Sequence, residues 1–376
     1  MRGTYNGPSD HGPGGNARVE SSTMTSRLED RPTFGRRHLL RGATGLGLSA
    51  IALSQRGVGR TTAQDVTCPP AASPVADIGT PEAASGQTIG VSVAYLSVPF
   101  YANFKTGIAD GATRFGFEYD LREGGGGDLA KEVGVIQDFI AQKVSLILLT
   151  PSGEGIIPSI KQANDAGIPV IEVNNRAGFG SGDAEVVTYV GADDVEFGRL
   201  QGKLLIDTFG GKPVKVGYVQ GISGTSPQIL RGQGFNEAIA DHPEIEIVGT
   251  VTDDFDSAKA LAVTQDLLTR FPKGQIDVIV MQGPEGVAAA DFARQSGRDE
   301  VKFILGDYPA DVRQAIMDGY VLGTVNQDPY PQAFEAMHMA SLLLNGNEAD
   351  IPKPNFLELP IITQENAEAT PPAWGC

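Results

Sequence analysis

The sequence predicts an α/β protein built from two doubly wound, Rossmann-like lobes with a ligand cleft at the hinge between them. Two observations predict it. Short β-branched runs recur from residue 88 onward, and helix-like stretches separate successive runs. Runs that are apolar throughout are typical of parallel strands covered on both faces by helices. A chain of 376 residues with 41% hydrophobic residues is long enough for two such lobes.

Eight runs are predicted to form strands, at 88–96, 145–150, 168–173, 214–220, 245–251, 276–281, 301–306 and 321–326. Gly167 and Pro169 support one boundary, because Gly ends a helix and Pro leads into the next strand. The runs fall into two series, so the expected domains are an N-terminal lobe, a C-terminal lobe and a final tail. Their expected ranges are 87–192 plus 328–356, 193–327 plus 357–366, and 367–376.

Residues 1–63 read as a leader. Arg36 and Arg37 precede a weakly apolar, Gly-rich run that is too short to span a bilayer permanently. This pattern predicts a twin-arginine export signal, cleaved after Ala63, and a periplasmic or extracellular protein. An amphipathic or disordered N-terminal arm is the alternative. The stretch 64–86 is rich in Pro, Ala and Ser and predicts a flexible tether.

Cys68 and Cys376 are the only cysteines, which excludes a zinc cluster or a disulfide-dense scaffold. Outside the cytoplasm the two thiols can oxidise to a disulfide that ties the ends of the folded region together. Lipid anchoring through Cys68 is the competing interpretation. The preceding Asp65, Val66 and Thr67 lack the apolar and small residues of a lipoprotein cleavage site.

The formal net charge is −17, and from residue 64 onward 20 basic residues face 42 acidic ones. So negative a surface repels phosphate backbones and anionic lipid headgroups, which argues against nucleic-acid and peripheral membrane partners. A neutral solute or a cation stays compatible with it. His242 and His338 are the only histidines beyond the leader and are interpreted as ordinary surface or core residues, so no metal is expected.

The sequence contains no catalytic motif in a fitting context. The glycines at 124–127 and at 178–182 are not expected to lie directly between a strand and its helix, as a dinucleotide site requires. The turn at 221–226 follows a strand but lacks the Gly-Lys pair of a phosphate loop. Two acid pairs, at 193–194 and 253–254, are interpreted as helix caps. We therefore expect no catalytic residue and no cofactor.

Several loops resemble the ribose- and galactose-binding proteins of the type 1 periplasmic binding family, over roughly residues 87–365. The segments that carry the resemblance are LSVPFYANFKTGIADGA, GISGTSPQILRGQGF, DDFDSAKA, ILGDYPAD and GTVNQDPYPQA. The resemblance implies that Phe100 and Tyr101 lie against one face of a sugar ring and Phe255 against the other. A helix-start or core apolar role is the alternative for these aromatic residues.

The same resemblance implies polar contacts with the ligand. Arg231 would donate to hydroxyl groups, and Asp307 and Gln327 would accept and donate. A solvated helix arginine and a helix-capping aspartate are the ordinary alternatives for the first two. The other candidate ligand-binding residues are Thr150, Asn174, Asn175, Arg176 and Gln282.

The chain also departs from ribose binders. Ala94, Val98, Thr150 and Gly283 stand where those proteins place Ser or Asn, so several ribose-specific donors are lost. This loss favours a deoxy sugar, a polyol or another pentose. The calcium loop of galactose binders is not found at 207–214, which has too few oxygen ligands.

The expected function is therefore that of an exported binding protein, not an enzyme. It captures a small neutral polar solute, a monosaccharide or a polyol, between closing lobes and delivers it as a monomer to ABC transporter permease subunits that work with a separate ATPase. A sugar sensor that feeds a chemoreceptor or a transcriptional response is the alternative, although a leader stands where a repressor would carry its DNA-binding headpiece. An enzyme on the same α/β scaffold is the remaining rival.

Overall fold

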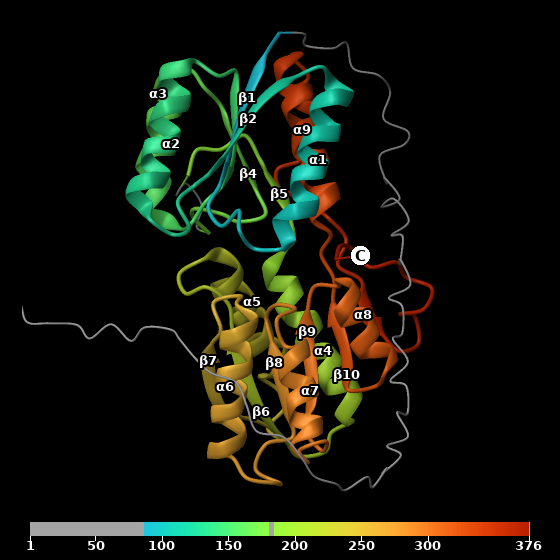
Figure 1. The fold of residues 1–376 in the computed structure, drawn as a ribbon. Helices are drawn as coiled ribbons and strands as arrows, with labels where there is room; N and C mark the ends of the chain where they lie inside the picture. The colour runs from blue at the N-terminus through green and yellow to red at the C-terminus, as the bar shows by residue number, and fades with distance from the viewer. Residues whose placement is uncertain (1–85, 180–183, 376) are drawn as a thin grey trace, which may run out of the picture. The chain divides into compact units, whose positions relative to one another are not determined.

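The structure is a computed structural model in which residues 86–179 and 184–375 are described (Figure 1). The leader, Cys68, nearly all of the predicted tether and Cys376 lie outside the described residues, so the predictions of a signal peptide, a disulfide and an anchor fall there as well. Among the described residues no helix combines the length and the apolar character needed to span a bilayer.

The first sheet has six strands in the order β11-β5-β4-β3-β1-β2, and all its pairs are parallel. Helices α1 and α9 cover one face, and α2 and α3 cover the other (Figure 1). We call this unit the N-lobe. Its elements are β1 (Thr88–Val93), α1 (Phe100–Phe115), β2 (Glu118–Glu123), α2 (Leu129–Gln142), β3 (Leu146–Thr150), η1 (Glu154–Ile156), α3 (Ile157–Asp165), β4 (Val170–Val173), β5 (Tyr189–Gly191), α9 (Pro329–Leu344), η2 (Glu348–Asp350) and β11 (Asn355–Phe356).

The second sheet has the order β12-β10-β9-β8-β6-β7 and is parallel except for β12, which pairs antiparallel with β10. Helices α4 and α5 pack on one face, and α6, α7 and α8 on the other. We call this unit the C-lobe. Its elements are α4 (Asp194–Phe209), β6 (Val214–Gln220), α5 (Ser226–Ile239), β7 (Ile245–Thr252), α6 (Ser257–Arg270), β8 (Val278–Met281), α7 (Val287–Gln295), β9 (Lys302–Gly306), α8 (Ala310–Met317), β10 (Val321–Val325) and β12 (Ile361–Thr363).

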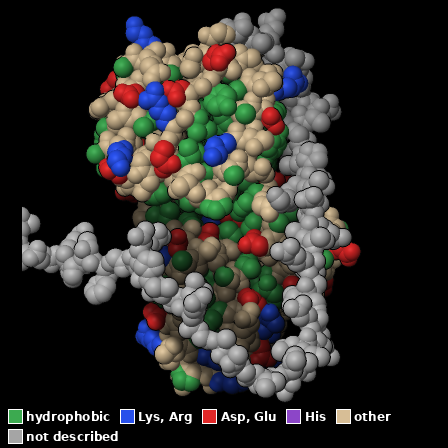
Figure 2. Space-filling model, viewed as in Figure 1, with side chains coloured by type: hydrophobic (Ala, Val, Ile, Leu, Met, Phe, Trp, Pro, Cys, Tyr) green, Lys and Arg blue, Asp and Glu red, His purple; other side chains and the backbone are tan. Residues whose placement is uncertain are grey.

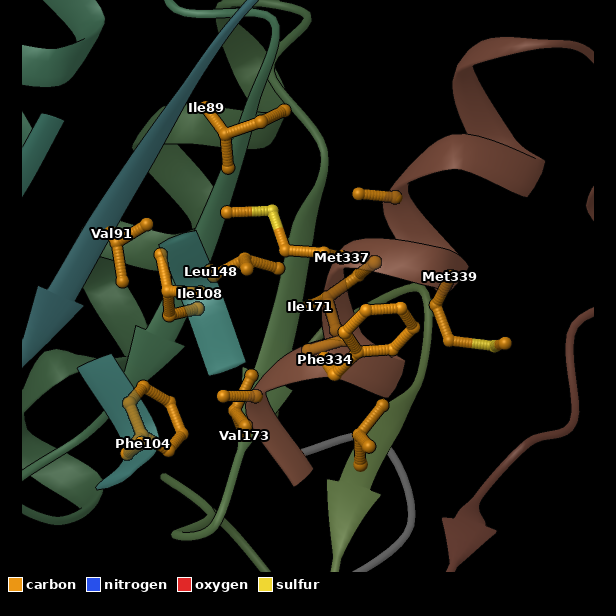
Figure 3. Close-up of a cluster of buried hydrophobic side chains, with 14 of the residues drawn as sticks. Ile89, Val91, Phe104, Ile108, Leu148, Ile171, Val173, Phe334, Met337 and Met339 are labelled. Carbon is orange, nitrogen blue, oxygen red and sulfur yellow. The ribbon is translucent and has the colours of Figure 1, made fainter. Parts of the chain in front are cut away.

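The N-lobe is assembled from two separate stretches of chain. The chain leaves its sheet after β5, returns after β10 to form α9 and β11, and leaves again to form β12. Figure 3 shows how closely the late segment is built into the core, with Phe334 and Met337 of α9 packed against Ile108, Leu148 and Ile171. These side chains are almost completely buried. Helix α9 of the N-lobe thus follows all five parallel strands of the C-lobe, β6 to β10, in the sequence.

The predicted fold class is confirmed, and each of the eight predicted runs contains a strand. Four strands were not predicted. β2 has the polar sequence EYDLRE and lies at a sheet edge with mostly exposed or half-exposed side chains, while β5, β11 and β12 have three residues or fewer. Missing β2 made one expectation wrong, because the glycines at 124–127 do lie directly between a strand and helix α2.

Candidate functional site

One cavity of about 370 Å³ lies at the carboxyl ends of the strands of both lobes. Its lining comes from the loops after β1 and β4 of the N-lobe, from the loops after β6 to β10 of the C-lobe, and from Trp374 and Gly375. In doubly wound sheets this is the edge at which ligands bind. Figure 2 shows green apolar and red acidic side chains together in the hollow at mid-height of the face drawn, which is the kind of mixture that lines the cavity.

Eight of the eleven candidate residues line this cavity: Phe100, Tyr101, Asn174, Asn175, Arg231, Phe255, Asp307 and Gln327. They come from both lobes and from distant parts of the sequence, so the structure brings most of the predicted set together. Thr150, Arg176 and Gln282 are not among the lining residues.

Aromatic rings form two walls of the cavity. Phe100 and Tyr101 meet edge to face with their centroids 5.2 Å apart, and Trp374 meets Phe100 in the same way at 5.3 Å. Phe255 comes from the C-lobe. Its ring lies where glycines leave room, since a Cβ at Gly221 would be 2.0 Å from Cζ and one at Gly283 would be 2.7 Å from Cδ1 of Phe255. Flat apolar walls of this kind suit the C–H faces of a ring or a carbon chain.

Arg231 is held in place on the C-lobe side. Its side chain is only 2% exposed, its Nε donates to Oδ1 of Asp194 at 2.8 Å, and its Nη1 donates to the carbonyl oxygen of Gln282 at 2.8 Å. The guanidinium carbon also lies 3.9 Å from the ring centroid of Phe197. Burial raises the pKa of Asp194, and the charge of Arg231 opposes that rise. The arginine is therefore fixed in direction by protein groups before it meets a solute.

The capping interpretation of the acid pairs is correct only for Asp193, which accepts from the amides of Val195 and Glu196. Asp194 pairs with Arg231 instead, because it faces the buried side of α4. At the second pair Asp256, not Asp253 or Asp254, caps α6.

Amide side chains link the polar groups of the N-lobe side. The hydroxyl of Tyr101 donates to Oδ1 of Asn174 at 2.8 Å, and Nδ2 of Asn174 donates to Oε1 of Gln332 at 3.1 Å. Nε2 of Gln332 then donates to Oε1 of Gln327 at 2.9 Å. Asn175 is held separately by its bond to the carbonyl of Pro151. This network fixes which atoms the amides present to the cavity.

The three candidates outside the lining have other contacts. The guanidinium of Arg176 lies over the rings of Tyr189 and Phe356, at 4.4 and 5.2 Å from their centroids. The side chain of Gln282 accepts from the amide of Gly221 and donates to the hydroxyl of Tyr218. Thr150 is buried at the end of β3, and its Oγ1 has no partner among the described residues. Gln282 thus supports the wall that holds Arg231 rather than facing the cavity.

Two carboxyl groups of the cavity have raised pKa values. Burial raises the pKa of Asp307 to about 7, although the charge of Arg231 and a hydrogen bond from Gln327 oppose the rise. Burial also raises the pKa of Glu285 well above its ordinary value, and repulsion from Asp253 and Asp307 adds to the effect. Oδ1 of Asp307 and Oε2 of Glu285 are buried without a hydrogen-bond partner among the described residues.

Sequence reasoning missed Tyr95, Glu285 and Trp374, which also line the cavity. Glu285 follows the carboxyl end of β8 by a few residues, so its place after a predicted strand was a usable signal. Trp374 lies in the segment interpreted as a tail. No periodic pattern marks it there, and its contacts are with residues far away in sequence, the ring of Phe100 and the backbone of Pro309 and Ala310.

Comparison with known proteins identifies the family of the chain. Residues 89–348 match the family described as periplasmic binding protein domain. The chain belongs to this family. The ribose import binding protein of Escherichia coli (strain K12) is 30% identical to this chain over 274 residues. The matched region covers 72% of this chain and 90% of the relative. The xylitol-binding protein of Mycolicibacterium smegmatis is 26% identical and covers 87% of the chain and 84% of the relative.

Solved structures give the same family. The binding protein of the arabinose ABC transporter from Shewanella sp. ANA-3, bound to L-arabinofuranose, superposes with a TM-score of 0.69 at 27% identity and covers 75% of this chain and 94% of that chain. The family expected from the loops is therefore confirmed, and these relatives are binding proteins.

Proposed function

We propose that this protein is the solute-binding component of an ABC importer and that its solute is a small polyhydroxylated molecule, a monosaccharide or a polyol. The observation that carries the proposal is the cavity at the carboxyl ends of both sheets, which has aromatic walls on two sides and polar side chains between them. Relatives named for ribose, xylitol and arabinose support the same solute class.

In this proposal the eight predicted residues that line the cavity contact the solute. Phe100 and Phe255 cover the carbon skeleton, and Arg231, Asp307 and Gln327 bind the hydroxyl groups. Burying the solute between the lobes removes competing water, so each hydrogen bond in the cavity gains strength. We assign no reaction to the site and treat the protein as a carrier that works as a monomer.

The lobe ranges belong to the same proposal. We assign 87–192 with 328–356 to one lobe and 193–327 with 357–366 to the other, and the sheet in which each strand pairs supports this division. The last segment, 367–376, contributes a wall of the cavity through Trp374 rather than a separate tail. Export by the twin-arginine route rests on Arg36 and Arg37 and remains part of the proposal.

The single tryptophan of the chain supplies the first test. Trp374 lines the cavity beside Phe100, so a bound solute should change its fluorescence. We expect a saturable change with at least one member of a panel of pentoses, hexoses, deoxy sugars and polyols, and a rise in melting temperature with the same compound. No response to any member of the panel would refute the proposed solute class.

A pair of variants links that response to the cavity. Phe255→Ala removes the ring that forms the C-lobe wall, so we expect Kd to rise by at least about tenfold. Tyr119→Ala is the control, because this tyrosine is exposed on the edge strand β2 and does not line the cavity. Equal weakening by both variants would place the binding site elsewhere.

A further inference from the structure

The cavity holds more negative than positive charge. Arg231 is the one cationic side chain among the described residues that line it, and Asp194 already pairs with that arginine. Asp307 and Glu285 line the cavity as well. Asp307 is only 5% exposed, and its Oδ1 has no hydrogen-bond partner among the described residues. A buried carboxylate oxygen without a donor is costly, so the site is built for a solute that brings one.

Glu285 extends this acidic surface along the C-lobe wall. A Cβ at Gly283 would lie 2.2 Å from its Oε2 and 2.7 Å from Cδ1 of Phe255, so the carboxylate oxygen and the aromatic ring share the space that Gly283 leaves open. Oε2 is buried and also lacks a partner among the described residues. Asp253 lies close enough to repel the charge of Glu285. The wall thus combines an aromatic ring with buried acidic side chains that have no cationic partner of their own in the described cavity lining.

We propose that the solute carries a protonated amine beside its hydroxyl groups, and that Glu285 and Asp307 accept hydrogen bonds from this ammonium group. The inference rests on the proposed function, since it names the chemical class of the solute for the same cavity. An ammonium group supplies both the donors and the positive charge that the two carboxylates lack. The aromatic rings of Phe100, Phe255 and Trp374 also line the cavity, and an aromatic ring attracts a cation placed over it. Amino sugars and amino polyols have this chemistry, in place of the wholly neutral solute expected from sequence.

Proton release gives the inference a signature of its own. The groups that face Glu285 are Asp253, Asp307 and Arg231, and burial together with the two acids favours its protonated form in the solute-free protein. An arriving cation favours the ionised form, so part of the carboxyl population loses its proton to the buffer on binding. A neutral polyol brings no charge and displaces water, so it gives no such release.

The test is calorimetric titration of the full chain with matched pairs of compounds at about pH 6, where the amines are almost fully protonated before binding, in two buffers of different ionisation enthalpy. The pairs are D-glucosamine with D-glucose, D-galactosamine with D-galactose, and 1-amino-1-deoxy-D-glucitol with D-glucitol. We expect an amino compound to bind at least tenfold more tightly than its neutral partner and to release protons. Glu285→Gln, which keeps the shape of the side chain, should remove most of that advantage.

Glu118→Gln is the matched control. It removes the same charge at the start of the edge strand β2, where the side chain is exposed and does not line the cavity, so binding should be unchanged. A neutral sugar or polyol that binds as tightly as its amino partner overturns the amine inference and leaves the proposed function standing. An amino compound that binds more tightly without proton release, or equally well to Glu285→Gln, overturns the role of the carboxylates. Failure of these pairs and of the wider sugar panel overturns both proposals.

Discussion

At the scale of single residues, the site depends on a buried ion pair that joins two helices. Asp194 begins α4 and Arg231 lies in α5, and each side chain is only 2% exposed. Removing one member of such a pair leaves a charge in a medium that solvates it poorly, which costs more than the loss of a surface contact. The neighbouring Asp193 has a different role, since it caps α4 at its exposed end.

The adjacent aspartates therefore make a matched pair of variants. We expect Asp194→Ala to lower the free energy of unfolding by about 3–5 kcal/mol, because it leaves the buried charge of Arg231 without its carboxylate partner. Asp193→Ala removes only the cap and should cost about 1 kcal/mol. Urea denaturation followed by circular dichroism measures both. Similar losses for the two variants would mean that the buried pair contributes no more than a cap.

Asp307 gives a prediction about pH. Its pKa of about 7 in the folded protein exceeds the ordinary value of 3.8 in the unfolded chain, so between these pH values the folded state keeps a proton that the unfolded state has lost. Stability from this group is therefore full below about pH 4 and falls as pH rises to about 7. Asp194 repels the ionised form, while Arg231 and Gln327 favour it.

Asp307→Asn removes this titration without changing the shape of the side chain. We expect the variant to be more stable than the parent at pH 8 by about 1–3 kcal/mol and to gain little at pH 4. Thermal unfolding across pH 4 to 8 is the measurement. If the stability difference between the variant and the parent were the same at pH 4 and at pH 8, the raised pKa of Asp307 would be contradicted.

How far the sequence predicts the site depends on the residue. Phe100, Arg231 and Asp307 were found because they stand in loops with several neighbouring matches to a known family. Trp374 and Asp194 were not, since their roles depend on contacts with Phe100 and Arg231 that only the fold creates. Arg176 matched the family in sequence, yet its guanidinium lies over Tyr189.

At the scale of elements, helices α4 and α5 approach each other unusually closely. A Cβ at Gly234 would lie 1.8 Å from the carbonyl oxygen of Val195, and one at Gly198 would lie 2.0 Å from that of Arg231. Both clashes are with backbone atoms, which cannot turn aside as a side chain can. These glycines therefore set the distance at which Asp194 and Arg231 can meet.

Gly234→Ala should separate the two helices. We expect a loss of stability of about 1–3 kcal/mol or more from overpacking, together with weaker solute binding because Arg231 shifts. Gly134→Ala is the control, since this glycine lies within α2, an added Cβ would meet nothing within 4 Å, and alanine favours a helix. That control should gain up to about 1 kcal/mol. Chemical denaturation distinguishes the outcomes, and a neutral effect of Gly234→Ala would contradict the close approach.

The sequence predicts the buried central strands well and the edge strands poorly. Runs such as 214–220 were placed correctly, because buried parallel strands are apolar throughout. The edge strand β2 was not predicted because its polar sequence is typical of a loop, and β11 and β12 are too short to show a pattern. Their pairing is decided by the sheets that they join.

At the scale of the whole molecule, the N-lobe depends on a segment that follows the C-lobe in sequence. Helix α9 shares one face of the N-lobe sheet with α1 and contributes Phe334, Met337 and Met339 to its core (Figure 3). Without α9 the apolar faces of Ile108 and Leu148 lose this cover. The N-lobe core thus depends on a helix from beyond the C-lobe strands more than the C-lobe core does.

A truncated chain tests this dependence. A chain that ends at Asp328 lacks α9, β11 and β12, and we expect the N-lobe to lose its cooperative unfolding and to bind a hydrophobic dye such as ANS. The C-lobe keeps its five parallel strands and loses the edge strand β12 and the packing of Ala367 against its core, so it should stay more resistant to proteolysis. Limited proteolysis with identification of the surviving fragment measures the difference. Survival of an N-lobe fragment of equal resistance would contradict it.

The divided N-lobe also sets an order of events during synthesis. A ribosome delivers β1 to β5 first, yet these strands wait for α9 until every parallel strand of the C-lobe has been translated. The C-lobe can therefore be nearly complete while one face of the N-lobe sheet is covered by α1 alone. A chaperone that shields nascent chains would then be needed most by the lobe that is begun first and finished last.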